Sequence, residues 1–549
     1  MANIIRSLGK QRYLNILLIV VPITLSSFTH IWNPIGYPTL HVDESHYMRR
    51  AMQVLEGLGP QESNATYDYG YDHPYFGQIF LAAVLSLVNY PHSINPSIDS
   101  HSIEMLYLVP RVLMGILAVV DTFLVYKIAD ARYNRKVAFI SSTLFAIMPL
   151  SSFLRGIFLD SIALPFILLS ILFAIYYAKS KTGNERVIFA NSGKNLFFIL
   201  PSGIFLGLAI FTKMPFFTII PLVVFILFQK NNTNGENGSR HRFRFTDIRV
   251  LTIWFLPVVL IPMLWPAYAI SVGQFHNWLD GVISQTARDP GGKDLRSSIL
   301  FILDLDPVLL IMGSAAVIYA VIKKDYFILL WALPYLVFLY LIGWVVPFHW
   351  NILIPLLCIA MGILIDSLIS TMASRKLIKF FPYLLVSAFI VFGFVTTTRI
   401  VESNLNALYF QMYLFMIQEL QHHNAGNAKE TPSHEYGTSI IGSHRTRALV
   451  WIPLYVFKDN ITFRDTDNPQ DNFTTPLKTK KFLVVADSKL LSRLIGTDQY
   501  ERDATVARLY YNKSETIATF IDKYYGKNNL MNIDQNYGFG WFVDVRANY

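Results

Sequence analysis

The sequence has a single cysteine and few charged residues. Cys358 lies inside an apolar run without a second cysteine in the chain, so a disulfide framework and a cysteine-based metal site are excluded. Asp, Glu, Lys and Arg together make up only 15% of the 549 residues, which is too little for a soluble protein. An internal repeat is also missing, and this absence disfavours a transporter built from two related halves.

The chain is rich in hydrophobic and aromatic residues. Hydrophobic residues make up 53% of the chain and aromatic residues 15%, with a mean hydropathy of +0.39. This composition predicts a polytopic α-helical protein of the cell membrane. The net charge of +9 does not indicate a nucleic-acid partner, because the basic residues gather in short loops between apolar runs. Such loops, at residues 132–136, 179–194, 230–249, 323–324 and 375–379, are typical of the cytoplasmic side.

Residues 1–398 are predicted to form a transmembrane domain of about eleven helices. Arg6, Lys10 and Arg12 precede the first apolar run and favour a cytoplasmic N-terminus. Residues 31–106 then form the first external loop, where the apolar stretch 75–90 is short for a crossing and predicts a helix along the membrane surface. The predicted spans are 13–28, 107–128, 137–154, 162–178, 196–212, 216–228, 250–270, 299–321, 326–346, 352–369 and 380–397.

The chain changes character after the last span. Residues 399–549 are mixed in polarity and are predicted to form a small extracytoplasmic α/β domain, since an odd number of spans puts the two termini on opposite sides. Alternating and β-branched residues predict strands at 439–443, 481–487 and 506–511. Helical patterns occur at 409–421 and 488–495.

Ionisable residues concentrate in the first external loop, between His41 and Gln78. Asp43 and Glu44 stand side by side ahead of a helical pattern, which puts Asp43 at or just before a helix N-terminus. That position favours the ionised carboxylate, which a reaction needs if it is to take a proton from an incoming hydroxyl or amide. The alternative is that Asp43 only caps the helix.

Three pieces of sequence resemble the GT-C superfamily of membrane glycosyltransferases, most closely the protein O-mannosyltransferases and dolichyl-phosphate-mannose-protein mannosyltransferases. The first is the acidic pair Asp43 and Glu44 after the first span. The second is Asp72 to Gln78 (DHPYFGQ), which is similar to the family's Asp-x-His-Pro-Pro-x-Gly-Lys stretch. The third is a run of spans with charged residues at their ends, namely Arg111, Arg155, Asp160 and Lys213.

The resemblance implies transfer of a sugar, such as mannose or another hexose, from a polyprenyl-phosphate carrier to a protein or lipid acceptor on the outer face. It implies inversion with Asp43 as general base, and it implies that His73, Arg111 and Lys213 lie around the lipid-phosphate sugar. The remaining candidates for substrate binding are Glu44, Asp72, Asp160 and His349. The sequence departs from the family at Tyr75 and Gln78, where the family has Pro and Lys.

Each of these residues also has a simpler interpretation. Arg111 and Lys213 could be interfacial side chains that snorkel to the headgroups, and Arg155 could pair with Asp160. His349 could belong to an interfacial aromatic belt. Asp304 and Asp306 could line the donor groove, but a helix cap is favoured for them. The turn-rich stretch 274–298 could be a lid over the site or an ordinary connector.

No cofactor is expected. A divalent cation is conceivable, because Asp43, Glu44, Asp72, His73, Asp160 and His349 carry ligand groups for a hard cation and related oligosaccharyltransferases use one, but we favour a metal-independent reaction. Two other functions stay open. One is a transferase that acts on a lipid or polysaccharide, as aminoarabinose transferases do, and the other is a multi-pass transporter.

Overall fold

The computed structural model describes residues 2–61, 71–90, 100–180, 196–229, 245–287, 294–374, 379–406, 410, 438–442, 461–465, 481–486 and 541–545. The first helices are α1 (Ala2–Ile31), α2 (Val42–Leu55), α3 (Phe76–Ser86), α4 (Ser100–Arg132), α5 (Arg135–Ile147), η1 (Pro149–Arg155), α6 (Leu159–Ser180) and α7 (Leu196–Thr212). They are followed by η2 (Met214–Ile219), α8 (Ile220–Phe228), α9 (Phe245–Leu260), α10 (Leu264–Ser271), α11 (Phe275–Thr286) and α12 (Leu295–Leu305). The last are α13 (Pro307–Ile322), α14 (Tyr326–Ile342), η3 (Pro347–Ile352), α15 (Ile354–Met372) and α16 (Phe381–Glu402).

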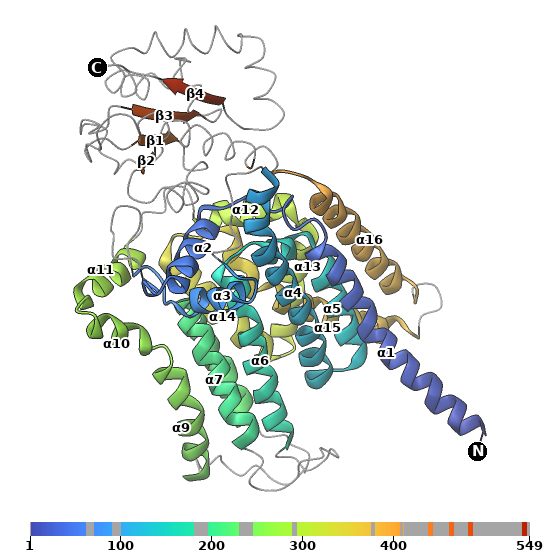
Figure 1. The fold of residues 1–549 in the computed structure, drawn as a ribbon. Helices are drawn as coiled ribbons and strands as arrows, with labels where there is room; N and C mark the ends of the chain where they lie inside the picture. The colour runs from blue at the N-terminus through green and yellow to red at the C-terminus, as the bar shows by residue number, and fades with distance from the viewer. Residues whose placement is uncertain are drawn as a thin grey trace. The chain divides into compact units, whose positions relative to one another are not determined.

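The chain forms two compact units. The first unit contains residues 1–34, 56–83 and 110–403, and the second contains residues 35–55, 84–109 and 404–549. The first unit is helical throughout its described part and holds the membrane-type helices (Figure 1). The second unit combines α2 with a small sheet.

Four described helices are long and apolar enough to cross a membrane, and the number rises to seven if each of three bent pairs is one span. The four are Glu104–Arg132, Leu159–Ser180, Ile354–Met372 and Phe381–Glu402. Each of the eleven predicted spans overlaps one described helix or two consecutive ones. The count of eleven itself stays a prediction, because several of these helices have 17 residues or fewer.

The predicted span 299–321 is not one continuous helix. It divides at Asp306 into α12 and α13, which meet at an angle of 115°. Asp306 is the N-cap of α13: its Oδ1 accepts from the N–H of Leu309 at 2.9 Å, and Pro307 occupies the first helical position. Proline is well tolerated there because it lacks the N–H that would have no helical partner. The expectation that Asp306 caps a helix is therefore confirmed.

Helices α6, α7 and α9 pack side by side in the first unit (Figure 1). Gly203 and Gly207 lie on the face of α7 that meets α9. A Cβ at either position would overlap a backbone oxygen, that of Trp254 or that of Pro257. The two glycines thus let the backbones approach closely, as small residues commonly do between membrane helices.

The second unit contains a four-stranded sheet of β1 (Thr438–Gly442), β2 (Ile461–Asp465), β3 (Lys481–Ala486) and β4 (Trp541–Val545). Its order is β2-β1-β3-β4, with β1 parallel to β2 and β3, and β4 antiparallel to β3. Strands β1 and β3 coincide with two of the three predicted strands. The third, at 506–511, and the predicted helices at 409–421 and 488–495 lie outside the described residues apart from Phe410, so the α/β domain stays a prediction.

Candidate functional site

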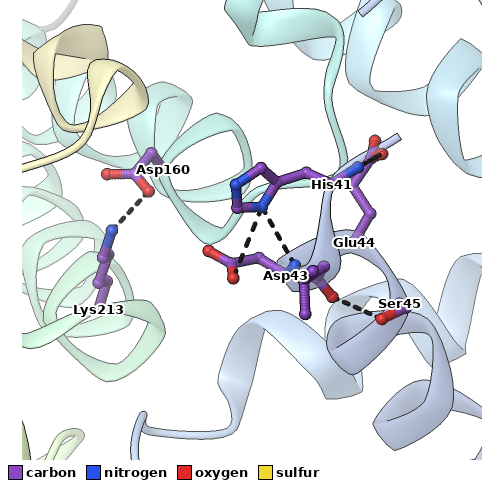
Figure 2. A network of polar contacts seen from close by, with 7 residues as sticks. His41, Asp43, Glu44, Ser45, Asp160 and Lys213 are labelled. Atoms are coloured by element: carbon purple, nitrogen blue, oxygen red, sulfur yellow. Dashed lines mark hydrogen bonds and ion pairs between the residues drawn. The ribbon is translucent and has the colours of Figure 1, made fainter. Parts of the chain in front are cut away.

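The N-terminus of α2 carries the acidic pair. The helix begins at Val42, so Asp43 is its second residue and His41 occupies the N-cap position. Glu44 makes the capping contact, because its Oε2 accepts from the backbone N–H of His41 at 3.1 Å (Figure 2). A glutamate at the third helical position that reaches back in this way forms half of a capping box. The interpretation of Asp43 as the helix cap is therefore wrong, and Glu44 takes that role.

Asp43 lies in the first turn with a partly exposed side chain. Its Oδ1 is 3.6 Å from Nδ1 of His41, and its backbone N–H donates to the same ring nitrogen at 3.2 Å (Figure 2). The ring nitrogen Nδ1 accepts that hydrogen bond through its lone pair. The side chain of Asp43 keeps 27% of its surface exposed, whereas Glu44 is fully buried. The positive end of α2 stabilises the ionised Asp43 carboxylate.

Asp160 and Lys213 form a buried ion pair in the first unit. Asp160 lies in the first turn of α6, and Lys213 follows the last residue of α7. Their Oδ2 and Nζ atoms are 2.6 Å apart, and only 3% and 5% of the two side chains are exposed (Figure 2). Lys213 is thus not an interfacial side chain that snorkels to the headgroups. A buried lysine must have its charge compensated, and Asp160 compensates it.

Phe348 lies beside this pair, and Phe158 and His349 pack against the ring of Phe348. Nζ of Lys213 lies 5.2 Å from the ring centroid of Phe348, and Phe158 stacks on the same ring at 4.5 Å. His349 packs edge-on against Phe348 and is 9% exposed, so it does not belong to a lipid-facing belt. Tyr335 donates to the backbone oxygen of His349 at 2.7 Å and fixes this turn. The structure therefore brings Asp160, Lys213 and His349 together around Phe348.

The segment that contains Asp72 and His73 is fixed by its neighbours in the chain. Tyr71 donates to Oε1 of Gln274 at 2.8 Å, and Tyr75 donates to the backbone oxygen of Leu264 at 3.1 Å. Burial, together with the nearby Tyr268 and Tyr75, raises the pKa of Tyr71 to about 12, so its phenol stays protonated and able to donate. The two tyrosines thus secure both ends of the Asp72-His73-Pro74 turn against α10 and Gln274.

The stretch 274–298 is less irregular than its sequence suggests. Residues 275–286 form α11, and α12 begins at Leu295. Gly281 of α11 lies so close to Tyr71 that a Cβ would overlap the backbone oxygen of that residue. The turn-rich residues 288–293 lie outside the described residues, so a lid role stays a prediction.

Arg111 and Arg155 are both fully buried and both hold the chain that follows α1. Arg111 donates to the backbone oxygen of Pro34 at 3.1 Å. Arg155 donates to the oxygens of Trp32 and Asn33, in the second case at 2.6 Å. Arg111 is therefore not an interfacial snorkelling side chain, and its predicted contact with phosphate is untested. Asp160 forms its 2.6 Å ion pair with Lys213. A further ion pair between Arg155 and Asp160 stays a prediction.

Sequence reasoning missed Phe348 and the capping role of Glu44. Phe348 stands beside His349 in an aromatic stretch at a membrane boundary, where aromatic residues are common for other reasons. Glu44 carried a signal that could have been used: an acidic residue two positions after Val42 fits the third position of a helix that begins there. Metal use stays untested. Within the described residues, no group of three or more His, Cys, Asp or Glu side chains could hold a metal ion.

Comparisons with known proteins bear on this arrangement. Residues 65–278 match the sequence model of the dolichyl-phosphate-mannose-protein mannosyltransferase family. No curated protein sequence matches the chain. The chain is a membrane glycosyltransferase that resembles this family. The matched segment of the glycosyltransferase includes Asp72, Arg111, Asp160 and Lys213, whereas Asp43 and His349 lie outside it.

Solved structures show the fold of the glycosyltransferase. The archaeal oligosaccharyltransferase AglB from Archaeoglobus fulgidus, in complex with an inhibitory peptide and a dolichol-phosphate, is 13% identical to it with a TM-score of 0.56, over 98% of this chain and 75% of that chain. A second structure of the A. fulgidus oligosaccharyltransferase, in complex with Zn and sulfate, is 14% identical with a TM-score of 0.52, over 91% and 71%. The chain therefore shares the fold of these two structures. Its long apolar helices indicate a multi-pass membrane protein.

Proposed function

We propose that the protein transfers a hexose, mannose in the first instance, from a polyprenyl-phosphate carrier to an acceptor on the outer face of the membrane. The acceptor hydroxyl or amide attacks the anomeric carbon as the bond to the phosphate oxygen breaks. The electron pair of that bond leaves with the lipid phosphate, the acceptor proton passes to Asp43, and the anomeric centre inverts. The family match to dolichyl-phosphate-mannose-protein mannosyltransferases supports this donor.

The position of Asp43 is the observation that carries the proposal. A general base must be ionised before the reaction and must be reachable by the acceptor. The N-terminal end of α2 favours the ionised form, and more than a quarter of the side chain is exposed at 27%. Glu44 caps the helix in its place, so Asp43 is not needed to begin α2.

Lys213 is the cation that we assign to the leaving phosphate. In the structure its charge is compensated by Asp160 at 2.6 Å, within aromatic surroundings. The leaving phosphate would bind the Lys213 ammonium as a second anion beside Asp160. Because Lys213 is buried and little water screens its charge, the attraction between phosphate and ammonium would be strong. Asp160 then acts as the group that holds Lys213 in place before the donor binds. Phe348 lies beside the Lys213 ammonium, and His349 packs against the ring of Phe348.

The test uses membranes that contain the full chain and radiolabelled polyprenyl-phosphate hexoses. Asp43→Asn keeps the shape of the side chain and removes the base, so incorporation of label should fall by about 1000-fold. Asp304→Asn is the matched control, because Asp304 is exposed in the last turn of α12 and should transfer label normally. Recovery of label in the protein or the lipid fraction identifies the acceptor class. Normal turnover by Asp43→Asn would remove Asp43 from the mechanism.

A further inference from the structure

The backbone that leads into Asp43 is held by one side chain from about 370 residues later in the sequence. Asn406 is fully buried, and its Nδ2 donates to the oxygens of Ile35 at 2.6 Å, Pro38 at 2.8 Å and Gly36 at 3.3 Å. Its Oδ1 accepts from the N–H of Leu40 at 2.9 Å. A single amide thus contacts four of the six residues from 35 to 40.

An asparagine is the residue that this arrangement requires. The amide offers two N–H donors on one side and a carbonyl acceptor on the other, and the segment presents carbonyl oxygens to the first and an N–H to the second. This pattern also fixes which way the amide points, since a flipped group would face oxygen with oxygen. An aspartate has the same size but no donor, and would set a carboxylate against three carbonyl oxygens.

Asn406 is itself held firmly. The N–H of the neighbouring Leu405 donates to the oxygen of Gly36 at 3.0 Å, and the oxygen of Asn406 accepts from the N–H of Phe410 at 3.2 Å. Phe410 is fully buried, with its ring 6.0 Å from that of Tyr107. Asn406 therefore links residues 35–40 to an ordered part of the same unit and not to a free end.

We propose that Asn406 is a positioning residue for the general base, an inference that rests on the role given to Asp43 above. Leu40 is followed by His41, the N-cap residue of α2, and Asp43 comes two residues later. Fixing residues 35–40 therefore fixes where α2 begins and where the Asp43 carboxylate lies. Displacement of a reacting group by about 1 Å can lower a rate by about 100-fold. The segment just after the last membrane helix, at the start of the predicted outer domain, thus contributes to the catalytic site.

The experiment measures kcat, and KM for the donor, with the purified full-length protein in detergent. Asn406→Ala and the equally sized Asn406→Asp should each lower kcat by about 100-fold while changing KM by about twofold or less, because the donor contacts are untouched. Asn406→Ser keeps one hydroxyl donor and should lie between them and the wild type. Thermal unfolding of every variant reports the folded fraction to which kcat refers.

A matched control separates positioning from stability. Asn134 also makes three side-chain hydrogen bonds, to the N–H groups of Lys136 and Val137 and to Asp366, but it caps α5 in the first unit, whereas residues 35–40 belong to the second. Asn134→Ala should lower the unfolding temperature and leave kcat unchanged. If Asn134→Ala lowers kcat as much as Asn406→Ala, loss of stability explains both variants and the inference is overturned.

Combining Asn406→Ala with Asp43→Ala distinguishes the inference from the function on which it rests. If Asn406 acts through Asp43, Asn406→Ala should cause no further loss of the residual activity of Asp43→Ala. A further 100-fold loss in that background would show that Asn406 acts elsewhere. Wild-type kcat in Asn406→Ala with an inactive Asp43→Asn would overturn the inference alone. Full activity of Asp43→Asn would overturn the proposed base first.

Discussion

Asp43 and Asp160 occupy the same kind of position, the first turn of a helix, in α2 and in α6. Their surroundings differ. Asp160 is 3% exposed and pairs with Lys213 at 2.6 Å, whereas Asp43 is 27% exposed and contacts His41 at 3.6 Å. Each carboxylate gains from the positive end of its helix. The two carboxylates differ in how much of their hydration is lost on folding and in whether a buried ammonium lies beside them.

The difference separates two uses of a carboxylate. The charge of Asp160 is balanced by an ammonium that has also been taken out of water, so each residue makes the burial of the other tolerable. Asp43 keeps part of its hydration, because 27% of its side chain is exposed. A carboxylate of the first kind stabilises a structure, and one of the second kind can exchange a proton with a substrate. Position in a helix alone does not decide between them.

The largest stability effect is expected at the buried pair. Asp160→Ala leaves the Lys213 ammonium buried and uncompensated, and should lower the free energy of unfolding by about 3 to 5 kcal/mol. Asp43→Ala should cost less than about 1 kcal/mol, because the side chain is partly exposed. Equilibrium unfolding in mixed micelles measures both.

The control for this prediction removes both charges. Asp160→Ala combined with Lys213→Met should be more stable than Asp160→Ala alone, since no unpaired charge remains inside. Equal losses of stability for Asp43→Ala and Asp160→Ala would show that the two aspartates do not differ in the way that their exposure indicates.

The sequence predicted the membrane helices better than it predicted their breaks. Apolar runs follow from composition alone, so each predicted span overlaps described helices. The local sequence indicates the helix cap at Asp306 but not the 115° bend or the contact that accompanies it, in which Oδ2 of Asp306 accepts from the N–H of Leu150 at 3.1 Å. A hydrogen bond between residues 156 positions apart can be found only in the folded chain.

In the candidate site, too, the sequence predicts individual residues better than it predicts their contacts with distant parts of the chain. The sequence predicts Asp160, Lys213 and His349 as charged or titratable residues near span ends, and in the structure they lie together around Phe348. Their partner Phe348 was not found, because aromatic residues at such boundaries are too common to stand out. Asn406 was missed for a related reason. It lies about 370 residues from the backbone oxygens that it binds, and an asparagine in a polar segment carries no signal of that contact.

A smaller effect on the Asp160 side should come from Phe348. Phe348→Leu keeps an apolar side chain but removes the ring 5.2 Å from Nζ of Lys213, and should lower the free energy of unfolding by about 2 kcal/mol. Phe381→Leu is the control, because Phe381 is half exposed on α16 and should change stability by less than about 0.5 kcal/mol. The same unfolding titration compares them. If the two variants are equally stable, the ring adds nothing to the burial of Lys213, and the pair with Asp160 carries that burial alone.

The smallest effect should come from Glu44, the direct neighbour of Asp43. Glu44→Gln can still accept from the N–H of His41, and loss of the favourable interaction between the charge and the helix end should cost about 0.5 kcal/mol. Transfer of label should stay within about threefold of the wild type, because a fully buried capping residue takes no proton from a substrate. Asp43→Asn removes the same charge from the same turn and should lower transfer by about 1000-fold. If Glu44→Gln is inactive instead, the catalytic carboxylate is Glu44, and exposure does not identify the base.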